Sequence, residues 1–96
     1  MSTPDDDPVV RQLRDQIADN DLEIVGLLNR RLSLVDQLWR YKAQHGLDMY
    51  NPQREQAMID LLADANTGPL SRDALVGVYR AIVETTKAEA TRLGAG

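Results

Sequence analysis

Residues 8–45 read PVVRQLRDQIADNDLEIVGLLNRRLSLVDQLWRYKAQH, and this stretch decides the fold class. After its first residue it contains no proline and a single glycine. Its apolar residues recur at separations of three, four and seven, as on one face of an α-helix: Val10, Leu13, Ile17, Ile24, Leu28, Val35 and Leu38. The pattern predicts one helix of about 37 residues, roughly 55 Å long.

Helix stop and start signals divide the rest of the chain into two shorter helices. The pair His45-Gly46 is a conventional helix end, and Asn51-Pro52 supplies an N-cap followed by proline at the first helical position. Thr67-Gly68-Pro69 ends the second helix, and Ser71 caps a third that ends near Leu93. The apolar faces are expected at Met58, Leu61, Leu62 and Ala65, and at Leu75, Val78, Tyr79, Ile82 and Val83. The sequence therefore predicts an all-α fold of three helices with no β-sheet.

Composition and charge narrow the classes of partner. With 15 acidic and 11 basic residues the net charge is −4, which argues against binding to nucleic acid or to a membrane surface. There are no cysteines for disulfides or thiolate metal sites. No apolar run approaches the roughly 20 residues that span a bilayer, and the start is acidic where a signal peptide is basic. We expect a cytoplasmic protein with a disordered acidic lead over residues 1–7 and one helical domain over residues 8–96.

The first helix is too long for the other two to cover. A single core in a chain of 96 residues is marginal without supplement. An apolar stripe left in water does not hold an isolated helix together. A homodimer with paired long helices is the simplest closed solution.

Two cations lie on the apolar stripe of the first helix. Arg31 and Lys42 fall nearly on one line, roughly 16 Å apart. Val35 and Leu38 lie between them. The cations could extend out of an interface or pair with acids, or they could form a buried anion site with a bidentate arginine and a lysine point charge. Arg14 is about 25 Å from Arg31 along the axis, so only in an antiparallel dimer could it reach the partner's site.

Arg54 and Glu55 lie in the first turn of the second helix, directly after Asn51-Pro52. One interpretation is a capped turn whose charges are solvated. The other is that this turn faces the first helix and brings a third cation and a carboxylate to the same cavity. Cations outside these motifs, such as Lys87, are expected on the surface.

An ordered set of motifs runs along residues 10 to 93. The motifs are Leu13-Arg14-x-x-Ile17, Asp21, Leu27-Leu28-x-Arg30-Arg31, Lys42, Tyr50-Asn51-Pro52-x-Arg54-Glu55 and Ile82-Val83-Glu84. No single motif is specific, but their order and separations are. Together they resemble the all-helical class of chorismate mutases.

The resemblance implies an intertwined helical homodimer with two equivalent active sites for a small dicarboxylate substrate. Arg14 would be donated from the other subunit, and Arg31 would bind a substrate carboxylate within its own subunit. Lys42 would hydrogen-bond the ether oxygen and a carboxylate. Arg54 would line the carboxylate end, and Glu55 would contact the ring hydroxyl.

The third helix departs from the family's pattern. Thr86 falls on a usual serine position, and Ala90 falls where the family has a glutamine that donates to the ether oxygen. Either Lys42 then acts alone or Glu89 turns inward, protonated or bridged by water. A slippage of one residue would instead pair Thr85 with Glu89.

The implied reaction is the intramolecular rearrangement of chorismate to prephenate, an isomerase step of the shikimate pathway to aromatic amino acids that needs no metal or cofactor. His45 is accordingly interpreted as a helix-end residue. Asn51 replaces the usual aspartate near the ring hydroxyl, and Arg40-Tyr41-Lys42-x-x-His45-Gly46 is similar to 4-amino-4-deoxychorismate mutases. Alternatives are therefore that activity, an isochorismate-pyruvate lyase, or a non-catalytic helical dimerisation or regulatory module.

Overall fold

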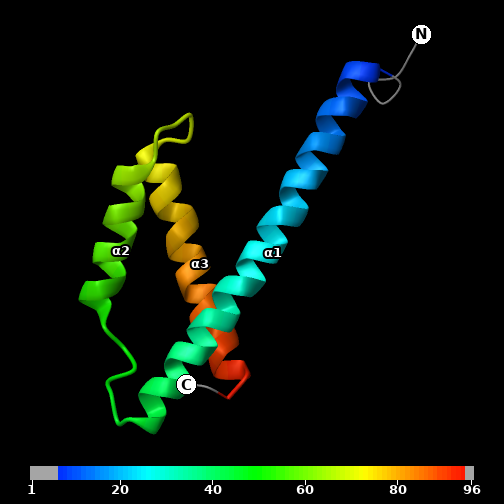
Figure 1. The fold of residues 1–96 in the computed structure, drawn as a ribbon. Coiled ribbons are helices and arrows are strands. Elements are labelled where there is room, and N and C mark those ends of the chain that lie inside the picture. Colours follow the sequence, from blue (N-terminus) through cyan, green and yellow to red (C-terminus); the bar gives the residue numbers. More distant parts are fainter. Residues whose placement is uncertain (1–6, 95–96) are drawn as a thin grey trace. The chain divides into compact units, whose positions relative to one another are not determined.

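The computed structural model describes residues 7–94, which form three helices and no strand. These are α1 (Pro8–Gln44), α2 (Pro52–Ala65) and α3 (Arg72–Arg92), shown in Figure 1. The predicted all-α architecture of three helices is confirmed. Over the described part of the chain, no helix is long and apolar enough to cross a membrane.

The chain divides into two units, residues 1–30 and 31–96. In the N-terminal unit, Asp7 is the N-cap of α1. Its Oδ1 accepts hydrogen bonds from the backbone N–H groups of Val9 (2.8 Å) and Val10 (3.2 Å). Of the lead predicted to be disordered, residues 1–6 lie outside the described residues. Asp7 belongs instead to the helix start, because its carboxylate satisfies amides that have no partner within the helix.

The apolar stripe of the N-terminal unit is exposed. The four residues Leu13, Ile17, Ile24 and Leu28 expose between 41% and 59% of their surface. No residue of α1 is buried. Since most helix stability in proteins comes from packing of an apolar face, this stripe is available for contact with another surface.

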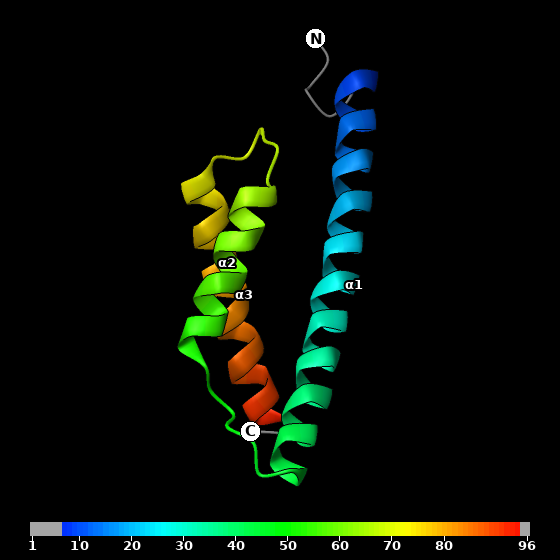
Figure 2. The same ribbon diagram turned by 60° about the vertical axis from the view of Figure 1, so that its left-hand side comes forward.

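In the C-terminal unit, α2 and α3 run antiparallel and side by side (Figures 1 and 2). Its buried residues are Ile59, Ala63, Val83, Thr86 and Ala90. The face predicted for α2 is wrong by one position, since Met58, Leu61 and Ala65 are exposed. Apolar residues occur at both 58 and 59 and at 61, 62 and 63, so periodicity alone allowed either register.

The end of α1 has the geometry that the sequence predicts. Gly46 has a φ of +64°, and the Leu47 N–H donates to the Lys42 carbonyl at 2.9 Å, which is the Schellman arrangement. His45 stacks on Tyr41, with ring centroids 4.0 Å apart, and its Nδ1 lies 2.9 Å from the Tyr41 carbonyl oxygen. This cap fixes the direction in which the chain leaves Lys42.

Polar contacts join the three helical segments of the C-terminal unit. Arg80 donates to the Gln56 side chain at 3.0 Å, and Arg72 pairs with Asp64 at 2.7 Å, both between α2 and α3. The Arg40 guanidinium donates to the carbonyl at residue 93 at 3.3 Å, linking α1 to the end of α3.

The N-cap of α3 supports a stability prediction. The Ser71 hydroxyl accepts a hydrogen bond from the Ala74 N–H at 3.2 Å. Ser71→Ala should lower the free energy of unfolding by about 1 kcal/mol, because that N–H has no other partner within the helix. Urea denaturation at equal protein concentration measures this, with Thr85→Ala on the exposed face of the same helix as the control. An equal effect of the two substitutions would contradict the capping role.

Candidate active site

A cavity of about 400 Å³ lies in the C-terminal unit, within the size range of ligand pockets. Its walls come from the C-terminal part of α1, the segment 49–51, the first turns of α2 and the C-terminal half of α3. The cavity is lined by six of the residues that the sequence predicts for a binding site: Arg31, Lys42, Asn51, Arg54, Glu55 and Thr86. Arg14 belongs to the N-terminal unit and is not among the lining residues.

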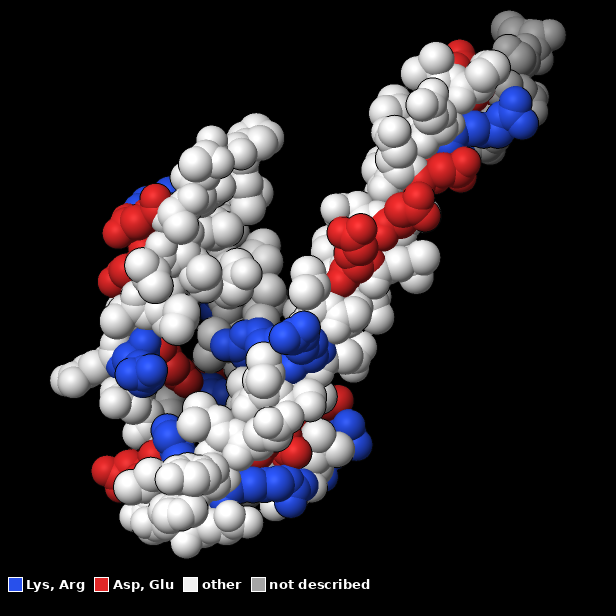
Figure 3. Space-filling view, in the orientation of Figure 1, with Lys and Arg blue, Asp and Glu red and all other residues white. Residues whose placement is uncertain are grey.

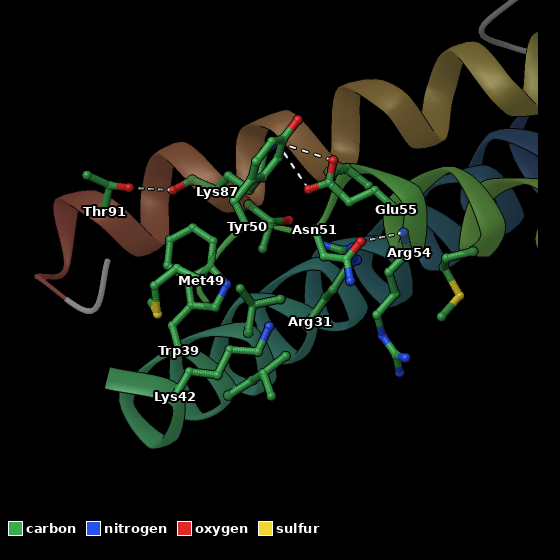
Figure 4. A pocket seen from close by; sticks show the side chains of 15 residues that line it. Arg31, Trp39, Lys42, Met49, Tyr50, Asn51, Arg54, Glu55, Lys87 and Thr91 are labelled. Atoms are coloured by element: carbon green, nitrogen blue, oxygen red, sulfur yellow. Dashed lines mark hydrogen bonds and ion pairs between the residues drawn. The ribbon is translucent and has the colours of Figure 1, made fainter. Parts of the chain in front are cut away.

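The cations of the cavity differ in burial. Arg31 and Lys42 are half-buried on α1 and project toward Asn51, whereas Arg54 is exposed (Figure 4). Val35 and Leu38 also line the cavity, so the α1 stripe presents apolar and cationic groups to one space. Figure 3 shows Lys and Arg atoms gathered around a hollow in this unit, with acidic atoms among them. Half-burial strengthens the attraction of these cations for an anion, since water screens them less.

Asn51 has both a structural and a chemical role. Its side-chain oxygen accepts the Arg54 N–H at 3.0 Å, which caps α2 (Figure 4). The oxygen is therefore engaged, and the amide NH2 is the group left to donate to a ligand.

The wall from α3 offers few hydrogen-bond donors. The Thr86 hydroxyl donates to the Ile82 carbonyl at 2.7 Å, so in this arrangement it can only accept from a ligand. Ala90 is fully buried, with 0% of its surface exposed. Thr85 is exposed and does not line the cavity, so the slipped pairing is wrong.

The alternative in which Glu89 turns inward is also wrong. Glu89 pairs with Arg92 at 2.8 Å on the outside of α3 and is not among the lining residues. The hydrogen bond that Arg92 donates lowers the pKa of Glu89, which favours the ionised form over the protonated donor. The sequence alone left open whether the Glu89 side chain turns inward. Its i, i+3 pair with Arg92 holds it outside the cavity.

Lys87 is not the surface cation that the sequence predicts. Its Nζ lies 3.1 Å from Glu55 Oε1, 3.1 Å from Glu84 Oε1 and 4.6 Å from the centre of the Tyr50 ring. It lines the cavity, and its side chain is 23% exposed. Burial by itself disfavours the charged ammonium, but the hydrogen bonds donated to the two carboxylates outweigh it and raise the pKa of Lys87. The sequence contained a signal for this position of Lys87. Lys87 follows Val83 by four residues and therefore lies on the same face of α3.

The charge balance of the cavity suits a small anion. Four cations and one carboxylate are among its lining residues: Arg31, Lys42, Arg54, Lys87 and Glu55. The chain as a whole has a net charge of −4, so this positive character is local. Among the described residues, no three His, Asp or Glu side chains gather so as to hold a metal ion. The arrangement can hold carboxylates and present fixed donors to developing negative charge.

Fold and cavity together define an all-α protein with a pocket between helices that is lined by several cations. Residues 13–91 match the sequence model of the family described as chorismate mutase type II, and this chain belongs to that family. Two structures of chorismate mutase from Thermus thermophilus resemble it at 28% identity. Form II has a TM-score of 0.81 over 86% of this chain and 94% of that chain, and form I has 0.78 over 80% and 96%.

Curated relatives are longer proteins. The T-protein of Haemophilus influenzae is 34% identical over 86 residues, which cover 88% of this chain and 23% of that protein. The bifunctional chorismate mutase/prephenate dehydratase of Aquifex aeolicus is 31% identical over 77% of this chain and 22% of that protein. The chain thus spans about a quarter or less of the length of the curated relatives it matches.

Proposed function

We propose that this chain is an isomerase that converts chorismate to prephenate, and that it works as a homodimer. The observation that carries the proposal is the cavity itself. Six of the seven residues to which the family resemblance assigns a role lie around one space, although they come from three helices. Folding alone does not require several cations at that place, whereas a dicarboxylate substrate brings two negative charges for cations to bind.

The reaction makes limited demands on the protein. One carbon–oxygen bond of the ether breaks and one carbon–carbon bond forms within the same molecule, so no atom is gained or lost. Catalysis then consists of holding the substrate in its compact reactive conformer and stabilising negative charge on the ether oxygen. Lys42, half-buried on α1, would donate to that oxygen. Ala90, at the position aligned with the family's glutamine, is fully buried and has no side-chain donor, so Lys42 would stabilise that oxygen without a glutamine.

The remaining groups would bind and orient the substrate. Arg31 would hold one carboxylate by a bidentate contact, and Arg54 would attract the other from the rim. Glu55 and the Asn51 amide would face the ring hydroxyl. The partner subunit's Arg14 would complete the site, as the family resemblance implies.

The exposed stripe of the N-terminal unit supports the dimer. Leu13 and Ile17 expose 52% and 59% of their surface within one chain. Pairing with the same stripe of a second chain would bury these residues in a closed, self-complementary interface. An intertwined dimer of this kind would also bring Arg14 to the partner's cavity.

A second candidate substrate is the 4-amino analogue, 4-amino-4-deoxychorismate. It is favoured by the segment around Lys42, which is similar to the mutases of that compound. Asn51 replaces the usual aspartate, so the part of the site that would contact the ring substituent differs from the family's pattern.

A direct assay tests the proposed function. Purified protein is incubated separately with chorismate, isochorismate and 4-amino-4-deoxychorismate, and kcat/KM is measured for each. We expect chorismate to give prephenate with a kcat/KM about tenfold or more above those of the two analogues, a ratio within the range that pocket contacts supply. Faster conversion of an analogue would reassign the substrate. If the folded protein converts none of the three compounds, the proposed activity is wrong and the chain is a non-catalytic helical module.

A further inference from the structure

Lys87, Glu55 and Tyr50 form a cluster at the α2–α3 side of the cavity (Figure 4). Lys87 Nζ lies 3.1 Å from one carboxylate oxygen of Glu55 and 3.4 Å from the other. The Tyr50 ring faces the same ammonium at 4.6 Å, within the range of a cation–π contact. Two independent partners thus fix the position of Lys87.

The Lys87–Glu55 pair controls the charge at this end of the cavity. The side chains are 23% and 29% exposed, so their attraction is less screened than on an open surface. Glu84, the other partner of Lys87, has a side chain that is 71% exposed and faces water. Among the described residues that line the cavity, Glu55 is the only carboxylate, and Lys87 compensates its charge.

We propose that Lys87 determines the substrate selectivity of the cavity by holding Glu55 in an ion pair, which favours a neutral ring hydroxyl over a positively charged ring amine. The inference rests on the proposed function, in which Glu55 faces the ring substituent. A hydroxyl can donate to a lone pair of the carboxylate that Lys87 leaves open, since an ionised carboxylate has about four acceptor positions.

An aliphatic amine behaves differently because it is protonated at neutral pH. Its ammonium would approach the Lys87 ammonium, and juxtaposed like charges in a partly buried site are strongly unfavourable. Without Lys87, an uncompensated Glu55 carboxylate would attract that amine. Lys87 thus permits binding of chorismate and disfavours binding of its amino analogue.

Two variants of Lys87 test the proposal. Lys87→Met keeps the length of the side chain and removes its charge, and Lys87→Arg keeps the charge. We measure kcat/KM for chorismate and for 4-amino-4-deoxychorismate. Lys87→Met should shift the ratio of the two toward the amine by about tenfold or more. Lys87→Arg should preserve the wild-type ratio, and so should Arg92→Met, which removes an exposed cation from the same helix outside the cavity.

A pH profile of the wild-type protein gives a second readout that needs no variant. As pH rises through the pKa of the substrate amine, the amine becomes neutral and its repulsion from Lys87 disappears. The wild-type preference for chorismate should therefore decrease with rising pH, and in Lys87→Met this decrease should be absent. If Lys87→Met does not fold, Lys87→Gln, which keeps a donor to Glu55, replaces it.

The outcomes separate this inference from the function on which it rests. If the wild-type protein converts neither substrate, the proposed function and the selectivity of Lys87 both fail. If chorismate is converted but folded Lys87→Met keeps the ratio within about twofold and keeps its pH dependence, the inference alone is overturned, because charge differences of this size in a partly buried site change affinities by more.

Discussion

Lys42→Ala should lower the turnover of chorismate by about 10²- to 10³-fold, the usual cost of removing a preorganised donor to a developing oxyanion. The loss should reach the upper end of that range, because the fully buried Ala90 supplies no second donor. Substrate binding should weaken much less, since charge on the ether oxygen develops only in the transition state. Steady-state kcat and the dissociation constant of a ground-state ligand measure the two effects separately.

Arg72→Ala is the control for that substitution. Arg72 is an exposed cation that pairs with Asp64 and does not line the cavity. Lys87 cannot serve as this control, because it lines the cavity beside Glu55. A folded Lys42→Ala variant with near-normal turnover would refute the electrostatic mechanism and favour a non-catalytic helical module.

Mixing two inactive variants should restore activity if each site is shared between subunits. Arg14→Ala chains combined with Lys42→Ala chains form heterodimers in which one of the two sites has both residues intact. With equal amounts and random exchange, half of the dimers are mixed, so about a quarter of the wild-type activity should return. Turnover is measured after subunit exchange at several mixing ratios, and it should be largest at equal amounts.

The readout of this experiment depends on proof of assembly and exchange. Sedimentation equilibrium should give about twice the chain mass of 10.7 kDa, because in the proposed dimer a second chain covers the exposed stripe of α1. A tag on one variant should retain the other. Confirmed exchange without any return of activity would exclude the donated Arg14, and a compact helical monomer at micromolar concentration would contradict the dimer itself.

The sequence by itself determined the three helices and their ends, because these depend on neighbouring residues. The Asn51-Pro52 start, the Ser71 cap and the Gly46 end all occur as predicted. Each is a local hydrogen-bond arrangement that a few residues encode. Periodicity also placed Arg31 and Lys42 on one stripe of α1, and they line the same cavity. A regular helix fixes side-chain directions without reference to the rest of the chain.

Only the tertiary structure decided which face of α2 is buried, whereas the face predicted for α3 contains the buried Val83. On α2, adjacent apolar residues permitted two registers, and packing against α3 buried Ile59 and Ala63. On α3, packing turned Thr86 inward, while a local pair with Arg92 kept Glu89 outside. The burial of Ile59 and Ala63 depends on contacts between residues distant in sequence, which periodicity cannot supply.

The position of Lys87 has the same physical origin. Spacing puts Lys87 on the same face of α3 as Val83, but it does not show which charge Lys87 meets, because Glu55 lies 32 positions earlier on another helix. The antiparallel packing of α2 on α3 brings the two charges to 3.1 Å. Burial then makes the pair more than a surface contact, because the attraction between two charges depends on the surroundings that the whole fold creates.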